Sequence, residues 1–235
     1  MQIEIWSDVV CPWCWIGRRH LELALERFAH REEVSVQWRS FELDPGAPPS
    51  RDGAYVDRLA GKYGTTVAQA QQMIDSMTAA GAKVGLDYRF DIARPGNTFD
   101  AHRLLHLAHE QGRQEALKDR LFRATFTEGE PISDRSTLTR LAVEVGLAEQ
   151  QVTEVLAGDR YAAEVRADER RAGELGATGV PFFVIDSRYG IPGAQPPDTL
   201  LQVLDQAWAD AHPSPVLVPA GDRDAPGCAD GTCAV

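Results

Sequence analysis

Two cysteines stand two residues apart in the stretch SDVVCPWCW. Thiols at this spacing can hold a metal ion, exchange disulfide bonds or simply pack. In disulfide exchange the nucleophile is a thiolate, and a helix N-terminus stabilises such an anion with its free N–H groups and its dipole. If Cys11 begins a helix, its pKa should lie below the ~8.5 of a free thiol. Cys11 would then attack a substrate disulfide and form a mixed disulfide, which Cys14 would resolve. Trp13, between them, would stay partly exposed to contact a partner.

Zinc is the main alternative for this pair. A zinc site needs about four ligands, and the only other cysteines, Cys228 and Cys233, lie far away at a spacing unusual for zinc. His102, His106 and His109 share one face of an expected helix, but no HExxH motif accompanies them. We therefore expect no metal site, and we interpret the three histidines as a polar edge of that helix.

A second motif is GVPFFVID, residues 179–186. Its continuous apolar run is typical of a strand that is covered on both faces, and a trans proline would be an odd residue in such a strand. A cis Val180–Pro181 bond would form a tight corner and leave the backbone of Val180 free to bind an extended substrate by strand addition. We expect this corner to face the cysteines; an ordinary trans proline at the first residue of the strand is the alternative.

The elements that must position these groups follow an interrupted α/β pattern. Residues 3–8 alternate as a strand does, a helical pattern follows the cysteines, and residues 34–43 alternate again. Residues 54–174 read mostly as helices, and the strand of the second motif is followed by a hairpin partner and by a helix that begins at PPDT. The predicted division is a core domain at 1–50 and 173–211, a helical insertion at 51–172, and a flexible tail at 212–235.

Composition limits the partners. The formal net charge is −11 and the sequence has no basic stripe, which argues against nucleic acid and anionic lipid as partners. No apolar run is long enough to cross a bilayer, and the start MQIEIWSDVV does not resemble a signal peptide. We expect a cytoplasmic protein, where paired cysteines are more often redox-active or metal-bound than structural.

The quoted motifs carry a family resemblance. SDVVCPWCW, NTFDAH, TGVPFFVI and YGIPGAQP, in this order, resemble the DsbA-like thiol oxidoreductases of the FrnE branch over about residues 2–210. The resemblance implies a thioredoxin-like fold with a large helical insertion. It also implies Cys11 as the nucleophile, Cys14 as the resolving thiol and a cis Pro181, whereas Asn97 and His102 in NTFDAH would contact the ligand.

The same resemblance leaves alternatives for the function. It implies a thiol–disulfide oxidoreductase that acts on protein or small-molecule disulfides, with no tightly bound cofactor and with glutathione or an equivalent thiol as co-substrate. The fold also includes 2-hydroxychromene-2-carboxylate isomerases and kappa-class glutathione transferases, which generally carry a serine at the nucleophile position. A binding module that captures a peptide or small molecule at the Val180–Pro181 corner without turnover is the third interpretation.

Three further residues or pairs carry open alternatives. Asp8 either caps or orients the cysteine motif, accepts a proton from Cys14, or lies in water. Cys228 and Cys233, with Gly231 between them, form a CxxxxC pair of the kind that some FrnE-like proteins carry. They either exchange disulfides with the first pair as a secondary redox centre or are bystanders. Gln195 either lines the site or begins the last helix.

Overall fold

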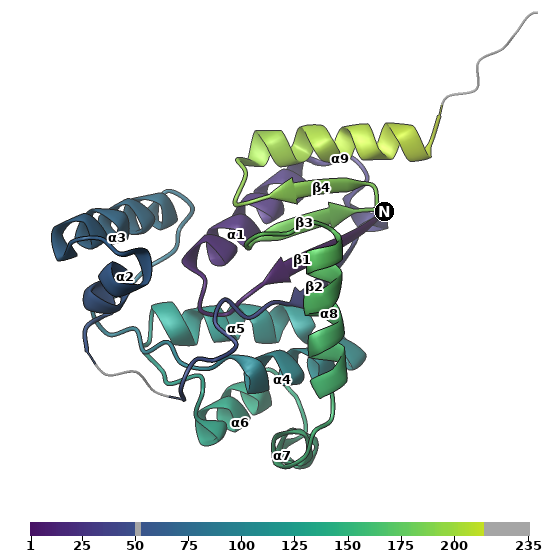
Figure 1. Cartoon of the computed structure of the whole chain (residues 1–235). Coiled ribbons are helices and arrows are strands. Elements are labelled where there is room, and N and C mark those ends of the chain that lie inside the picture. The colour runs from purple at the N-terminus through teal and green to yellow at the C-terminus, as the bar shows by residue number, and fades with distance from the viewer. Residues whose placement is uncertain (50–52, 214–235) are drawn as a thin grey trace, which may run out of the picture.

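A four-stranded mixed sheet lies at the centre of the computed structural model, which describes residues 1–49 and 53–213 (Figure 1). The strand order is β2-β1-β3-β4. Strand β1 runs parallel to β2 and antiparallel to β3, and β3 and β4 form an antiparallel hairpin. The strands are β1 (Gln2–Ser7), β2 (Ser35–Ser40), β3 (Phe182–Ile185) and β4 (Tyr189–Pro192).

Helices cover both faces of this sheet and fill the long segment between β2 and β3. Helix α1 connects β1 to β2, α9 follows β4, and the helices α2 to α8 lie between β2 and β3. The helices are α1 (Pro12–Arg27), α2 (Tyr55–Tyr63), α3 (Val67–Ala82), α4 (Phe99–Glu110), α5 (Gln114–Phe126), α6 (Arg135–Glu144), α7 (Glu149–Ala157), α8 (Ala162–Glu174) and α9 (Pro197–Ala211), with a 3-10 turn at Arg31–Glu33.

The side chains of β1 alternate between the two faces of the sheet, and each face is covered by its own helices. Because successive side chains of a strand point to opposite faces, Ile3 and Ile5 pack with α1 and α9, whereas Trp6 packs on the other face with Ala172 of α8. The helices α4 to α7 enclose a separate apolar core, and α2 and α3 form a hairpin that projects from it toward α1 (Figure 1). The cysteines therefore lie where the sheet, the hairpin and the insertion meet.

This architecture confirms the predicted α/β pattern with its helical insertion. The second strand is shorter than predicted, because the chain leaves the sheet after Ser40 and the Leu43 amide donates instead to the Asp8 carboxylate. The expected boundary between residues 172 and 173 falls inside α8, and the division into domains stays a prediction. Within the described residues, no helix has the length and apolar character needed to span a bilayer.

Candidate active site

Cys11 caps the N-terminus of α1, as predicted. Its backbone is extended (φ −100°, ψ 110°), Pro12 occupies the first helical turn, and Cys14 follows one turn later. Proline suits this position because its missing N–H would have had no partner inside the helix. Both cysteines are free thiols in this structure; Cys11 is 5% exposed and Cys14 is fully buried. Only the first sulfur is thus within reach of a substrate, which fits the expected attacking and resolving roles.

The second motif lies directly opposite Cys11. The Val180–Pro181 bond is cis, which confirms the prediction, and the Cys11 thiol donates a hydrogen bond to the Val180 carbonyl with an Sγ–O distance of 3.6 Å. Gly17 lets α1 approach this corner closely. A Cβ added at Gly17 would lie 2.9 Å from Cγ of Pro181 and 3.3 Å from Cζ of Phe183. Sequence reasoning missed this role of Gly17, because a glycine in a helical pattern gives no sign of what packs against it.

Ionisation of the thiol pair departs from the expectation for a helix N-terminus. The pKa of the Cys11 thiol lies well above its usual range, mainly because of a hydrogen bond with Cys14 and, second, because of burial. The nearby negative charge of Asp8 acts in the same direction. In the dithiol form, the hydrogen bond with Cys14 and the loss of hydration therefore outweigh the helix dipole.

Asp8 and His102 form a buried pair behind the thiols. The Asp8 carboxylate lies 3.3 Å from Nε2 of His102 and 2.8 Å from the Leu43 amide, so the interpretation of Asp8 as a residue in water is wrong. Burial by itself raises the pKa of Asp8, but the hydrogen bonds from His102 and from the Leu43 amide outweigh it, and the pKa lies below its usual value. Burial lowers the pKa of His102, so a neutral imidazole donates its Nε2–H to Asp8 near neutral pH.

Lys118 of α5 is a buried cation at the same place. Its side chain is fully enclosed, and Nζ donates to the Ser7 carbonyl at 3.3 Å. Burial lowers the pKa of Lys118 to about 8, while the charges of Cys14, Asp8 and Cys11 act against this lowering. Lys118 was not among the predicted site residues. Its signal was its spacing of three and four residues from the buried Leu121 and Phe122, on a helix face where a solvent-exposed lysine would not be expected.

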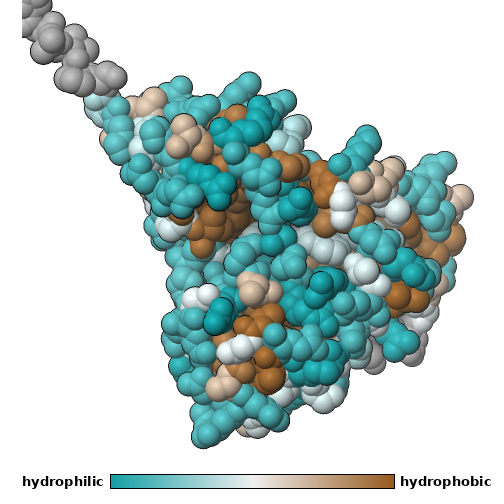
Figure 2. All heavy atoms as spheres, turned by 180° about the vertical axis from the view of Figure 1, so that it is seen from behind, coloured by the Kyte–Doolittle hydropathy of each residue, from teal (hydrophilic) through white to brown (hydrophobic). Residues whose placement is uncertain are grey.

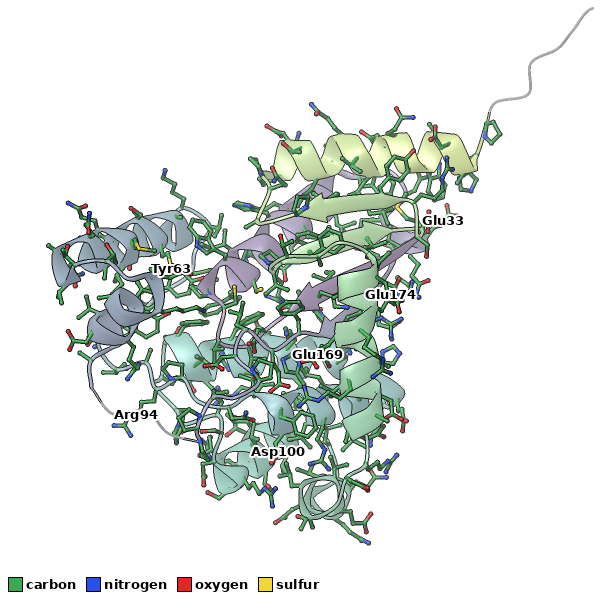
Figure 3. All side chains as sticks on the ribbon, in the orientation of Figure 1. Glu33, Tyr63, Arg94, Asp100, Glu169 and Glu174 are labelled. Carbon is green, nitrogen blue, oxygen red and sulfur yellow. The ribbon has the colours of Figure 1, made fainter. Side chains whose placement is uncertain are left out.

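A pocket of about 490 Å³ opens over Cys11. Its wall combines the cysteine motif, the loop before β3 and the α2–α3 hairpin; the lining side chains include Asp8, Cys11, Trp13, Tyr55, Arg58, Lys62, Tyr63, Met73 and Val180. Trp13 is 43% exposed, as expected of a partner contact. Tyr63, the last residue of α2, is labelled on the hairpin in Figure 3. Figure 2, from behind, shows apolar side chains at the end of the molecule formed by the hairpin, where Val67 and Met73 are exposed.

An aromatic wall ties the first turn of α1 to the insertion. The Tyr88 hydroxyl donates to the Pro12 carbonyl at 2.5 Å, and the Trp15 ring stacks on Phe122 and Phe126 with centroid distances of 5.9 and 6.2 Å. The insertion thus holds the helix that carries both cysteines. Tyr88 was not predicted, because its sequence neighbourhood has no strong periodicity.

The residues of NTFDAH lie next to the pocket. Gly96 and Thr98 line it whereas Asn97 and His102 do not, and the expected contact of these two residues with a ligand stays a prediction. The Asn97 side chain instead accepts a hydrogen bond from the Phe99 amide at the start of α4, and His102 reaches the site only through Asp8. Gln195 precedes α9, and its side chain donates to the Pro192 carbonyl.

The three helix-face histidines bind different partners. His102 contacts Asp8, His106 contacts Ser40 and Asp168, and His109 contacts Gln37. Among residues 1–49 and 53–213, no group of three potential metal ligands lies close enough together to hold an ion. Cys228 and Cys233 lie outside the described residues, so their expected redox role stays a prediction.

Comparison with known proteins places this site in a family. The model of the DsbA-like thioredoxin domain matches residues 2–205, which confirms the thioredoxin-like fold. An uncharacterized protein of Bacillus subtilis, YwbO, is 30% identical over 212 residues, which are 89% of this chain and 96% of that protein. The crystal structure of a probable DsbA oxidoreductase from Streptomyces coelicolor, SCO1869, is 47% identical, with a TM-score of 0.85 and coverage of 100% of this chain and 99% of that one.

A more distant structure shares the fold alone. The cytosolic disulfide reductase DsbM of Pseudomonas aeruginosa, solved with GSH, is 19% identical with a TM-score of 0.62 over 88% of this chain and 99% of that one. The family model and the close relatives together cover nearly the whole described chain. The chain belongs to the DsbA-like thioredoxin domain family.

Proposed function

We propose that this protein is a thiol–disulfide oxidoreductase that works through a mixed disulfide at Cys11. The observation that carries the proposal is the reduced thiol of Cys11 at the mouth of α1, with its sulfur 3.6 Å from the Val180 carbonyl at the floor of an open pocket. The buried Cys14 one turn behind it is in the place that a resolving thiol needs. Membership of the DsbA-like family supports the same chemistry.

The reaction follows from these positions. The Cys11 thiolate attacks a substrate disulfide, one substrate sulfur leaves as a thiolate, and Cys11 becomes joined to the other. The thiolate forms when the Cys11 thiol releases its proton to solvent, which ends its hydrogen bond to the Val180 carbonyl. That carbonyl is then free to accept a hydrogen bond from the backbone of an extended substrate. Cys14 next attacks Cys11, the internal disulfide forms, and the second substrate sulfur leaves. A thiol reductant returns the pair to the dithiol.

The pocket indicates the kind of substrate. Apolar and aromatic surface from Trp13, Tyr63 and Met73 flanks the sulfur, and the cations of Arg58 and Lys62 lie in the same wall. We propose disulfides of proteins or of small anionic thiols as substrates and glutathione or an equivalent thiol as the co-substrate. The DsbM structure contains GSH and that protein is described as cytosolic, which supports this choice and a cytoplasmic location.

Reduction of insulin disulfides by a dithiol tests the proposal. We expect turnover by the wild-type protein, loss of turnover in Cys11→Ser, and strongly reduced turnover in Cys14→Ser. The same variants distinguish the alternatives. Glutathione-dependent isomerisation of a chromene carboxylate that survives in Cys14→Ser would favour the isomerase, and binding of a peptide without any turnover would favour the binding module. Full reductase activity in Cys11→Ser would contradict the proposed mechanism.

A further inference from the structure

The ammonium of Lys118 is buried in the protein interior, where an isolated charge costs free energy. The side chain is one of the largest fully buried side chains of the described chain, and Nζ lies 5.1 Å from the ring centre of Phe122 and 5.2 Å from that of Trp38. Nζ donates a hydrogen bond to the Ser7 carbonyl, at the end of β1. A buried ammonium with so few polar contacts is stable only if anions lie close by.

The groups that face Lys118 belong to several elements. Cys11 and Cys14 lie at the start of α1, Asp8 follows β1, and Glu115 is on α5 itself; each interacts with the ammonium electrostatically. The charge of Lys118 also contributes to the lowered pKa of the neutral His102 on α4. Asp8 is already bound to His102 and Leu43, and Glu115 bonds Trp38 and Arg18. The sulfurs are therefore the anions whose charge changes with the chemistry of the site.

The choice of lysine is informative in this composition. The chain has 24 cationic residues, of which 21 are arginine and three are lysine. The three lysines are Lys62 in the pocket wall, Lys83 at the exposed end of α3, and the buried Lys118 of α5. An arginine keeps its proton at every physiological pH, whereas a buried lysine can release it. Lys118 lies over Phe122, which packs in one apolar cluster with Cys11 and Cys14. This position is thus filled by the cation that can change its charge.

We propose that Lys118 acts through Cys14: its buried ammonium stabilises the Cys14 thiolate, and its protonation is linked to the redox state of the cysteine pair. This inference rests on the proposed function, because it concerns the resolving step of that reaction. In the reduced state the Cys14 thiolate holds the ammonium in its charged form. In the disulfide state both sulfurs are neutral, so the burial of Lys118 is no longer compensated by them and the ammonium releases its proton more readily.

The resolving step balances as follows. The Cys14 thiolate attacks the Cys11 sulfur of the mixed disulfide, the Cys11–Cys14 bond forms, and the bond between Cys11 and the substrate sulfur breaks. The substrate sulfur leaves with the electron pair, so the substrate is reduced and the cysteine pair is oxidised by two electrons. Lys118 then releases its proton, which ends on the leaving thiolate or in solvent. A thiol reductant reverses both changes when it restores the dithiol.

Titration of the thiolate absorbance at 240 nm tests the electrostatic part. In a background where Cys228 and Cys233 are serine, the reduced-minus-oxidised signal reports only the pair at Cys11 and Cys14. A cation close to an anion shifts its pKa by about 1–3 units, so Lys118→Met should move thiolate formation upward by at least about one pH unit, a tenfold loss of thiolate at a given pH. Lys83→Met makes the same chemical change at an exposed site and should leave the curve unchanged.

This titration requires no turnover, so it separates the inference from the proposed function. An unchanged curve in folded Lys118→Met would overturn the inference even if the enzyme reduces insulin. A shifted curve in a protein that reduces no disulfide would instead refute the proposed function and leave the charge interaction standing. Circular dichroism establishes that the variant is folded.

Lysine NMR on the wild-type protein tests the redox linkage without any variant at this site. Because the chain has three lysines, ¹³Cε labelling gives three signals, and Lys62→Arg and Lys83→Arg assign two of them. We expect the Lys118 signal to titrate near pH 8 in the dithiol protein and at a lower pH in the disulfide form. A Lys118 signal that titrates at the same pH in both redox states, or at the pH of an exposed lysine, would overturn the linkage.

Discussion

Replacement of Gly17 by alanine tests the contact between α1 and the Val180–Pro181 corner. The added Cβ would lie 2.9 Å from Cγ of Pro181 and 3.3 Å from Cζ of Phe183, and neither atom is the free end of a flexible side chain. Forcing an extra methyl into such a packed site costs about 1–3 kcal/mol. Alanine recovers roughly 0.5–1 kcal/mol because glycine is a poor helix former, so the net loss of stability is about 0–2.5 kcal/mol.

Thermal unfolding and turnover together measure this effect. For a chain of this size, 1 kcal/mol corresponds to about 2–4 °C in Tm, so we expect a Tm that is lower by up to roughly 10 °C. The displaced corner carries the Val180 carbonyl that faces Cys11. Because small misplacements of groups at a reaction centre lower the rate strongly, turnover should fall by about tenfold or more. The activity loss should persist at temperatures where the variant is fully folded.

A matched control lies in α2. Gly61 is also a helical glycine, but nothing lies within 4 Å of an added Cβ. Gly61→Ala should therefore raise the stability by about 0.5–1 kcal/mol through helix propensity alone. If Gly17→Ala raises Tm as much as Gly61→Ala does, the close approach between α1 and Pro181 is not present in solution and our reading of the site is refuted.

Three further predictions concern the surroundings of the site. Tyr88→Phe removes the hydrogen bond to the buried Pro12 carbonyl and should lower the unfolding free energy by about 1–3 kcal/mol in urea titrations; an unchanged midpoint would contradict it. Burial raises the pKa of Glu42 from 4.5 to about 7, so the folded wild type holds an extra proton in this window and loses stability as pH rises through it. Glu42→Gln should remove that slope between pH 5 and 7, and parallel stability curves for the two proteins would refute the assignment. Replacing Cys228 and Cys233 by serine should leave Tm unchanged and slow turnover with at least one electron donor, and equal rates with every donor tried would make the pair a bystander.

Much of the architecture could be predicted because the relevant signals are local. The alternation of Ile3 and Ile5, the CPWC spacing and the apolar run after Pro181 each depend on a few neighbouring residues. Such patterns fix element type and the order of elements. The placement of Cys11 at the helix mouth followed in the same way, since Pro12 favours the first helical turn.

The rest depends on contacts between segments far apart in the chain. Lys118 meets Cys14, and Tyr88 meets Pro12, only because α5 and the loop before α4 fold back onto α1. No local pattern specifies that approach. The raised pKa of Cys11 was missed for the same reason, because the helix dipole is visible in the sequence whereas burial and the hydrogen bond with Cys14 are not.

Trapping of a mixed disulfide at Cys11 tests the central claim most directly. Cys14→Ser, with Cys228 and Cys233 also replaced by serine, should react with glutathione disulfide and carry one glutathione, because the resolving thiol is gone. Peptide mapping by mass spectrometry should place that adduct on Cys11, and Cys11→Ser in the same background should form none there. A Cys14→Ser protein that stays unmodified under conditions in which the wild type turns over would contradict the account.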